Sequence, residues 1–358
     1  MGLIDPYAQG LSSSSRSRIA ATTQGYGMFA LIEHVNESSD FNYINKELLG
    51  STGHSMGGNA AIRGANYFGK KADEQNKKSL LHSVYVSGYV LTLRDDVLKD
   101  VRSNVGVSYA LYDEGSFRNE LKNWDAANMK IAPESLRTVN SGLQKEEHIS
   151  EVELGKYYGD LESNTLRVIF NEELLHPFQP YNAEATANQL AYFETVFGAP
   201  IKLDTYDQIW QWKEFFTLLN MIISFWLLIP LTRTLLKINF FKTLVKPIPE
   251  ALPVQNRVGK TIFWSVFFVS AGIACVTFIP LVEVAKTLFP EAATRQLTWF
   301  FPQRMNNSVM LWALLNGSIG IFLFFVTYYF FGKKHGVKIN SWGLKLSFKD
   351  IYLSLIHI

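Results

Sequence analysis

The stretch Thr52-Gly-His-Ser-Met-Gly-Gly58 decides how the first half of this chain is interpreted. It fits the pattern G-x-S-x-G, in which a serine occupies a sharp turn between a strand and a helix. Residues 46–52 (KELLGST) are typical of a strand that leads into the turn. Residues 59–68 (NAAIRGANYF) have apolar residues at helical spacing and no proline, which predicts a helix. We therefore expect Ser55 to lie at a strand-to-helix junction.

Further strands and one clear helix follow this turn. Runs rich in β-branched and aromatic residues predict strands at 80–90, 104–112 and 165–170. Residues 182–197 predict a helix, with Asn182 as its N-cap and Gly198 at its end. Strands that alternate with helices indicate a mostly parallel sheet of the α/β class.

Three polar residues, Ser55, Asp113 and His176, each come just after a predicted strand. Sites in parallel sheets form at the carboxyl ends of the strands, so these residues are candidates for one site. A serine hydroxyl becomes a good nucleophile only when a base takes its proton. His176 is the histidine that follows a strand and precedes a helix. The alternatives are a structural Gly-Ser turn for Ser55 and a surface-loop histidine for His176.

The remaining histidines are weaker candidates for the base, and two carboxylates compete for the role of the acid. His54 is expected to point away from the serine and to pack or hydrogen-bond locally. The remaining histidines lie in a helix, at a strand start, in a charged segment or beyond the apolar runs: His34, His82, His148, His335 and His357. An acid must orient the imidazole and stabilise its charged form. Asp113 is the first carboxylate after the third strand, Glu114 is its competitor, and a solvated acidic turn is the third option.

The order serine, acid, histidine resembles that of the α/β-hydrolase family over about residues 3–198. Residues 5–14 (DPYAQGLSSS) look like the family's D-x-x-G-x-G-x-S segment after the fourth strand, with Ala8 in place of the first glycine. The resemblance implies that Ser55 is the nucleophile, Asp113 the acid after the seventh strand and His176 the base after the eighth. It predicts an α/β-hydrolase sheet whose N-terminal strands are missing.

The resemblance also implies an oxyanion hole. The family uses the backbone N–H after the nucleophile, here Met56, and a second N–H from a loop that would lie upstream of Met1. Gly53 and Gly57 are expected to let the strand and helix approach closely. We expect the chain to be truncated at both ends and poorly active as it stands, because losing one oxyanion donor costs about 10²–10³ in rate.

The second half is dominated by three uncharged apolar runs. A membrane-spanning helix needs about 20 residues. The runs contain 18, 22 and 27 residues at 215–232, 261–282 and 306–332. They predict an all-α transmembrane region of three helices, at about 215–235, 261–283 and 307–332. The predicted organisation is a partial hydrolase domain at 1–200, a connector at 201–213, the transmembrane region at 214–334 and a cytoplasmic tail at 335–358.

Basic residues indicate the orientation of these helices. They are concentrated between the first two runs and after the third: Arg233, Lys237, Lys242, Lys246, Arg257, Lys260, Lys333, Lys334, Lys338, Lys345 and Lys349. Basic loops stay cytoplasmic, which predicts a bacterial cell-membrane protein with the hydrolase domain outside the cytoplasm. The basic loop could also bind anionic lipid.

Composition narrows the functional classes. The net charge of +2 gives no indication of nucleic-acid binding. Cys275 is the only cysteine, which excludes an intramolecular disulfide and a Cys-based metal site, and we expect neither a metal nor a cofactor. We expect a membrane-anchored serine hydrolase that acts on a small-molecule or lipid-like acyl substrate, with an ester favoured over a peptide or amide. Residues 115–164 would cap its site. The alternative is a non-catalytic polytopic membrane protein whose inactive hydrolase-fold outer domain is a binding module.

Overall fold

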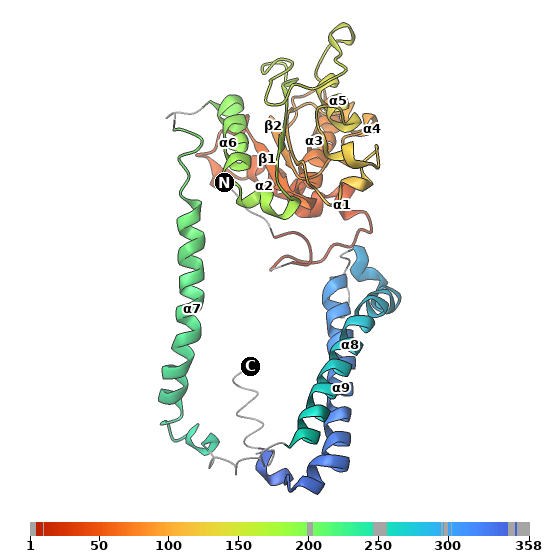
Figure 1. The fold of residues 1–358 in the computed structure, drawn as a ribbon. Coiled ribbons are helices and arrows are strands. Elements are labelled where there is room, and N and C mark those ends of the chain that lie inside the picture. The colour runs from red at the N-terminus through yellow and green to blue at the C-terminus, as the bar shows by residue number, and fades with distance from the viewer. Residues whose placement is uncertain are drawn as a thin grey trace. The chain divides into compact units, whose positions relative to one another are not determined.

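A computed structural model describes residues 5–9, 11–198, 203–245, 256–294, 296, 300–301, 303–342 and 348. The chain divides into two units. The first comprises Met1–Gln208 and Glu291–Gln303, and the second comprises Ile209–Pro290 and Arg304–Ile358. The sheet lies in the first unit, and the three long helices lie in the second (Figure 1).

A four-stranded parallel sheet forms the centre of the first unit (Figure 1). Its strands lie side by side in chain order: β1 (Gly50–His54), β2 (Ser83–Ser87), β3 (Asn104–Ala110) and β4 (Arg167–Glu172). Every neighbouring pair is parallel. The carboxyl ends of all four strands therefore meet at one edge of the sheet, and the expected α/β class is present.

Helices pack on this sheet on both faces. The two long ones are α3 (Met56–Gln75), which packs on β1 and β2, and α6 (Ala183–Phe197), which packs on β2, β3 and β4. The shorter helices are α1 (Ala20–Thr23), η1 (Gly25–Gly27), α2 (Met28–Glu37), η2 (Ser39–Phe41), α4 (Asp95–Leu98), η3 (Ser116–Arg118), η4 (Trp124–Ala127), α5 (Pro133–Asn140), η5 (Lys145–Glu147) and η6 (His176–Tyr181).

Alternating side chains supply one core to each face of the sheet. Val84 and Val86 belong to the core that contains Phe68 of α3. Tyr85, between them in β2, belongs instead to the core that contains Tyr192 of α6. Successive residues of a strand point to opposite faces, so a run of apolar residues fills both cores at once. This explains why the strands of the sequence are continuous apolar runs.

The structure revises two sequence expectations in this unit. The first strand begins at Gly50 and continues to His54, four residues later at its start than predicted. The segment 115–164, expected to cap the site, contributes buried Met129, Ala132 and Val139 to the core on the α3 face. Part of that segment is therefore a layer of the sheet domain, because α5 packs on β4.

The second unit contains three helices that are long and apolar enough to cross a membrane, as predicted. These are α7 (Trp210–Leu235), α8 (Arg257–Leu288) and α9 (Arg304–Thr327), and α9 continues through the turns η9 (Tyr328–Gly332) and η10 (Lys333–His335). The short elements η7 (Lys242–Leu244), η8 (Pro290–Thr294) and η11 (Ile339–Trp342) complete the described chain. In the most apolar window of each candidate span, no residue is buried. These features indicate a membrane protein.

Helices α8 and α9 pack side by side as a hairpin (Figure 1). The indole Nε1 of Trp312 donates to the carbonyl oxygen of Ala274 at 2.8 Å, and Asn316 Nδ2 donates to Thr277 Oγ1 at 3.4 Å. Parts of the predicted connector and tail, including His357, lie outside the described residues.

The connection between α8 and α9 belongs to the sheet unit. Gln296 forms a parallel β-bridge with Ser15, and its side-chain Nε2 donates to the carbonyl oxygen of Arg16 at 2.8 Å. Gln303 Nε2 donates to the carbonyl oxygen of Ala8. The segment that resembles D-x-x-G-x-G-x-S is therefore held by residues from far along the chain.

Candidate active site

Ser55 occupies a strained turn between β1 and α3. Its φ of 56° and ψ of −115° lie in a region that residues with a side chain rarely adopt. The turn is tied on both sides, because Ser55 N–H donates to Ser87 O at 2.8 Å and Asn59 N–H donates to Ser55 O at 3.1 Å. The hydroxyl makes no capping bond to α3. It is therefore left for other contacts at the carboxyl edge of the sheet.

Two glycines are required by this turn. A Cβ added at Gly53 would lie 2.4 Å from the carbonyl carbon of Gly57, and one at Gly58 would lie 2.9 Å from Ser87 O. A Cβ at Gly57 meets no atom within 4 Å. The steric requirement that the sequence suggested for Gly53 and Gly57 therefore falls on Gly53 and Gly58.

The structure brings Asp113 and His176 together from the ends of β3 and β4. His176 Nδ1 lies 2.9 Å from Asp113 Oδ2, and Asp113 Oδ1 accepts the Gly115 N–H at 2.6 Å. The Asp113 side chain is only 6% exposed. A carboxylate only accepts hydrogen bonds, so Nδ1 carries the ring proton and Nε2 is free to act as a base. Glu114, the competing acid, is exposed to solvent.

A buried polar network fixes the short helix that His176 begins. Within η6, Gln179 Nε2 donates to Ser108 Oγ at 2.6 Å and to Glu172 Oε2 at 3.2 Å. Asn188 of α6 donates to Glu172 Oε1 at 2.9 Å. Burial raises the pKa of the Glu172 carboxyl, and these donors partly offset that effect. The network ties η6 to the ends of β3 and β4 and so holds His176 in place.

His54 faces the site, whereas the sequence interpretation had it pointing away. Its ring centroid lies 4.5 Å from that of His176, and its Nδ1 is hydrogen-bonded to Ser87 Oγ at 3.1 Å. Burial, and next the nearby His176, lower the pKa of His54 to about 4, while Asp113 acts in the opposite direction. His54 is therefore neutral at neutral pH.

Gly88, at the end of β2, provides the space in which these side chains converge. A Cβ at this position would lie 2.7 Å from His54 Cε1, 3.0 Å from Gln179 Oε1 and 3.0 Å from His176 Cε1. Its φ of +64° also favours glycine. The sequence placed Gly88 inside the predicted strand 80–90, whereas β2 ends at Ser87, so no sequence signal indicated this role of Gly88.

The three predicted residues, Ser55, Asp113 and His176, are not all connected by hydrogen bonds. Within the described part of the chain, no hydrogen bond links Ser55 Oγ to His176. The His54 contact nevertheless positions the His176 ring beside the residue that precedes Ser55.

The backbone N–H of Met56 is the first of α3, a 20-residue helix. The first N–H groups of a helix have no intrahelical acceptor and lie at its positive end. Such a group can stabilise a negative oxygen that forms next to Ser55. Among the described residues, no group of three or more His, Cys, Asp or Glu side chains is placed to hold a metal ion.

Comparison with known proteins identifies no relative: no protein-family model, curated protein or solved structure matches this chain. The interpretation of this site therefore rests on its residues and their geometry.

Proposed function

We propose that this chain is a membrane-anchored serine hydrolase of the α/β-hydrolase type, which cleaves an acyl bond. The observation that carries the proposal is the 2.9 Å contact between Asp113 and His176, with the His176 ring packed against His54. His54 immediately precedes Ser55, whose backbone is strained. A strained serine after one strand, followed in the chain by an acid and a histidine after later strands, is the arrangement of a nucleophile elbow and its triad.

In the proposed reaction, Ser55 Oγ attacks the carbonyl carbon of the substrate while His176 Nε2 takes the hydroxyl proton. The positive charge that forms on the imidazole is stabilised by Asp113, and the Met56 N–H donates to the carbonyl oxygen as it becomes negative. His176 then gives its proton to the leaving group as the bond to the acyl carbon breaks. Water, deprotonated by the same imidazole, hydrolyses the acyl-serine and restores Ser55.

Exposed apolar side chains support an apolar acyl substrate. They follow β3 and β4 at the carboxyl edge: Tyr112, Phe117, Trp124, Leu175, Phe178 and Tyr181. Trp124 is 87% exposed and packs edge-on against Phe117 at 5.1 Å. Groups of exposed apolar side chains often mark ligand-binding surfaces. We therefore favour a lipid-like or other small ester over a peptide.

The proposal puts the sheet unit outside the cytoplasm of a bacterial cell. Basic residues flank α7 and α8 on the side where they are joined, and more follow α9. The connection between α8 and α9 is in the same unit as the sheet, as expected if both lie on one side of the membrane.

A fluorophosphonate probe tests the enzymatic function directly. The probe forms a covalent bond to an activated serine and needs only one turnover, so a slow enzyme still becomes labelled over hours. The full chain in detergent micelles should be labelled at Ser55, and Ser55→Ala should abolish labelling. Ser163→Ala is the matched control, because Ser163 is exposed and, among the described residues, its hydroxyl donates only to the nearby Asp160.

Absence of labelling in protein that is folded by circular dichroism would contradict the proposal. It would favour the non-catalytic alternative, in which the sheet unit is a binding module. Labelling that persists in Ser55→Ala would show that another serine reacts.

A further inference from the structure

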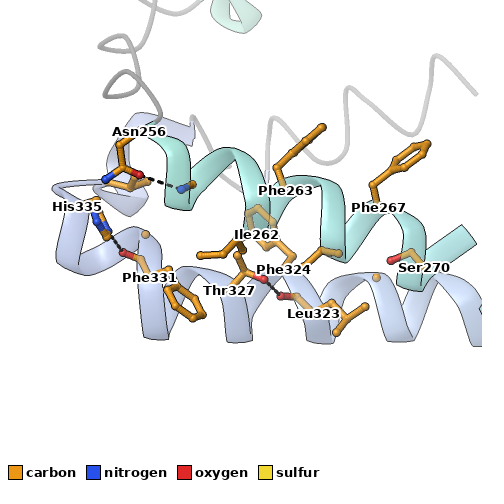
Figure 2. A pocket seen from close by; sticks show the side chains of 15 residues that line it. Asn256, Ile262, Phe263, Phe267, Ser270, Leu323, Phe324, Thr327, Phe331 and His335 are labelled. Atoms are coloured by element: carbon orange, nitrogen blue, oxygen red, sulfur yellow. Dashed lines mark hydrogen bonds between the residues drawn. The ribbon is translucent and has the colours of Figure 1, made fainter.

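Residues of α8, of α9 and of the segment that follows α9 line an apolar groove of about 520 Å³ (Figure 2). Apolar side chains from both helices form its walls: Ile262, Phe263 and Phe267 from α8, and Leu323, Phe324 and Phe331 from α9 or its continuation. Both helices are candidate membrane spans. A groove of this kind holds hydrocarbon in a bilayer, either from a lipid or from another helix.

Three of the polar side chains in the groove, Thr327, His335 and Asn256, are hydrogen-bonded to the backbone of their own helix or its first turn. Thr327 Oγ1 donates to the carbonyl oxygen of Leu323 at 2.7 Å, and His335 Nδ1 donates to that of Phe331 at 2.8 Å (Figure 2). At the same end of the groove, the Gly259 N–H donates to Asn256 Oδ1 at 2.8 Å. The walls therefore favour an acyl chain over a polar solute.

Positive charge gathers at the end of the groove where Asn256 and His335 lie. Five exposed cations flank these two residues in the sequence: Arg257, Lys260, Lys333, Lys334 and Lys338. None of the five has an ion-pair partner among the described residues. The sequence has no Asp or Glu between 256 and 282 or between 304 and 342.

We propose that this groove binds an anionic phospholipid, with an acyl chain between α8 and α9 and the phosphate against the cations at its basic end. Basic pockets between membrane helices bind anionic headgroups through this combination of apolar and positive surface. Another helix could fill the groove but would leave the five cations unpaired. At the opposite end of the hairpin the charges are mixed, because Lys286 pairs with Glu283 at 2.5 Å. The selectivity for anionic lipid therefore belongs to one end.

Native mass spectrometry of the full chain, with added phosphatidylglycerol or phosphatidylcholine of identical acyl chains, tests the headgroup. The wild type should bind phosphatidylglycerol more tightly than phosphatidylcholine. The triple variant Arg257→Gln, Lys333→Gln, Lys334→Gln should bind phosphatidylglycerol about a hundredfold more weakly, because each basic residue contributes to headgroup attraction. The double variant Lys286→Gln, Arg304→Gln neutralises charge at the opposite end and should leave binding unchanged.

A second pair of variants tests the acyl chain. Gly320 lines the groove and a Cβ there meets no atom within 4 Å, so Gly320→Phe can place a ring in the groove without a clash at its Cβ. Gly272 of α8 is equally open but does not line the groove, and Gly272→Phe is the control. Binding of phosphatidylglycerol should be lost in the first variant and kept in the second.

Equal binding of the two lipids, or equal binding by both phenylalanine variants, would overturn the proposal. So would a disulfide formed in the presence of excess phosphatidylglycerol, either between Gly320→Cys and a second cysteine introduced in α7 or between the Gly320→Cys positions of two copies of the chain. These readouts do not involve Ser55, so they stand or fall separately from the proposed hydrolase.

Discussion

Polar side chains are used in opposite ways in the two units. In the sheet unit, buried polar groups join different elements, as when Ser108 of β3 donates to Glu172 of β4 at 2.9 Å. In the α8–α9 hairpin, hydroxyls mostly bond within their own helix, as when Thr277 donates to the carbonyl oxygen of Ile273 at 2.7 Å. Apolar side chains show the reverse pattern, because they fill the interior of the sheet unit and cover the outside of the helices.

The surrounding solvent explains this difference. Water forms hydrogen bonds with the polar groups on the surface of the sheet unit, and apolar groups are buried away from it. Polar groups inside the unit have no contact with water and need hydrogen-bond partners on neighbouring elements. Hydrocarbon offers no hydrogen bonds, so a polar side chain that faces it bonds to the nearest carbonyl of its own helix. Chemistry that depends on several polar groups at fixed distances therefore belongs to the sheet unit. The second unit offers mainly apolar and basic surface.

The largest effect on the sheet unit is expected from a substitution at Asp113. In the proposed mechanism, Asp113→Asn removes the charge that stabilises the imidazolium of His176 and fixes its tautomer. The rate of fluorophosphonate labelling should then fall about 10⁴-fold, the loss that the same change causes in a Ser-His-Asp triad. Glu114→Gln should label at the wild-type rate. A large loss in Glu114→Gln with no loss in Asp113→Asn would show that Glu114 is the acid. Wild-type labelling rates in both variants would show that neither carboxylate takes part in the mechanism.

Gly88→Ala is expected to have the next largest effect. The added Cβ would lie 2.7 Å from His54 Cε1, so the His54 ring must move, and 3.0 Å from His176 Cε1, so the His176 ring must give by a few tenths of an ångström. A shift of about 1 Å at a reacting group costs about a hundredfold in rate, so this smaller shift of His176 should lower the labelling rate at Ser55 by about tenfold.

Gly155→Ala separates this contact from backbone strain. Gly155 has a φ of +76°, close to the +64° of Gly88, but its nearest contact would be Phe170 Cε1 at 3.8 Å. Its labelling rate should stay within a few-fold of the wild type. Equal losses in the two variants would show that strain alone, and not the contact with His54 and His176, accounts for the effect.

Much of the sheet unit could be predicted from the sequence, because its signals are local. Apolar runs gave the strands, and in a parallel sheet the residues after them share one edge. This is why Ser55, Asp113 and His176 were identified together as candidates. Capping was equally local: the Asn182 side chain accepts the Ala185 N–H at 3.0 Å, as its position before the helix predicted.

The packing around the imidazole could not be predicted in the same way. His54, Gly88 and Gln179 come from three separate segments, and their contact depends on the distances between strand ends and on side-chain rotamers. Neither quantity leaves a periodic signal in the sequence. The assignment of Gly57 failed for a similar reason, since the motif identifies the turn but not the direction in which a Cβ would point.

The charge state of His54 gives a smaller, pH-dependent test. Its pKa falls from 6.5 to about 4 on folding, mainly because of burial. Above pH 6.5 His54 is neutral in the folded and the unfolded state, so its titration does not lower the free energy of unfolding. As the pH falls towards 4, the free energy of unfolding decreases, because His54 takes up a proton in the unfolded state before it does so in the folded state. We expect a loss of about 2 kcal/mol, after allowance for partial exposure of the ring.

Hydrogen exchange of the β2 amides measures this loss within the sheet unit. Between pH 6.5 and 4, protection in the wild type should fall relative to that in His54→Gln, which lacks the titrating group. His148→Gln, at an exposed histidine, should behave like the wild type. Parallel curves for the wild type and His54→Gln would mean that His54 is not held neutral.

The smallest effect is expected for the hydrogen bond between α8 and α9. It tests whether polar contacts between elements stabilise the hairpin less than they stabilise the sheet unit. Asn316 donates to Thr277 Oγ1 across the helices, but it also donates to the carbonyl oxygen of Trp312 on its own helix at 2.8 Å. A double-mutant cycle of Asn316→Leu and Thr277→Val should therefore give a coupling of only about 0.6 kcal/mol, measured by unfolding in mixed detergent micelles.

Asn104→Leu provides the matching measurement in the sheet unit. Its Oδ1 accepts the Leu166 N–H at 3.0 Å, and the residue is fully buried. Loss of this acceptor leaves a buried N–H unsatisfied, which costs about 1–3 kcal/mol. That cost should exceed the hairpin coupling, because the buried N–H of Leu166, just before β4, has no other hydrogen-bond acceptor among the described residues. A hairpin coupling as large as the Asn104 effect would mean that α8 and α9 are held together by polar contacts, as the sheet unit is.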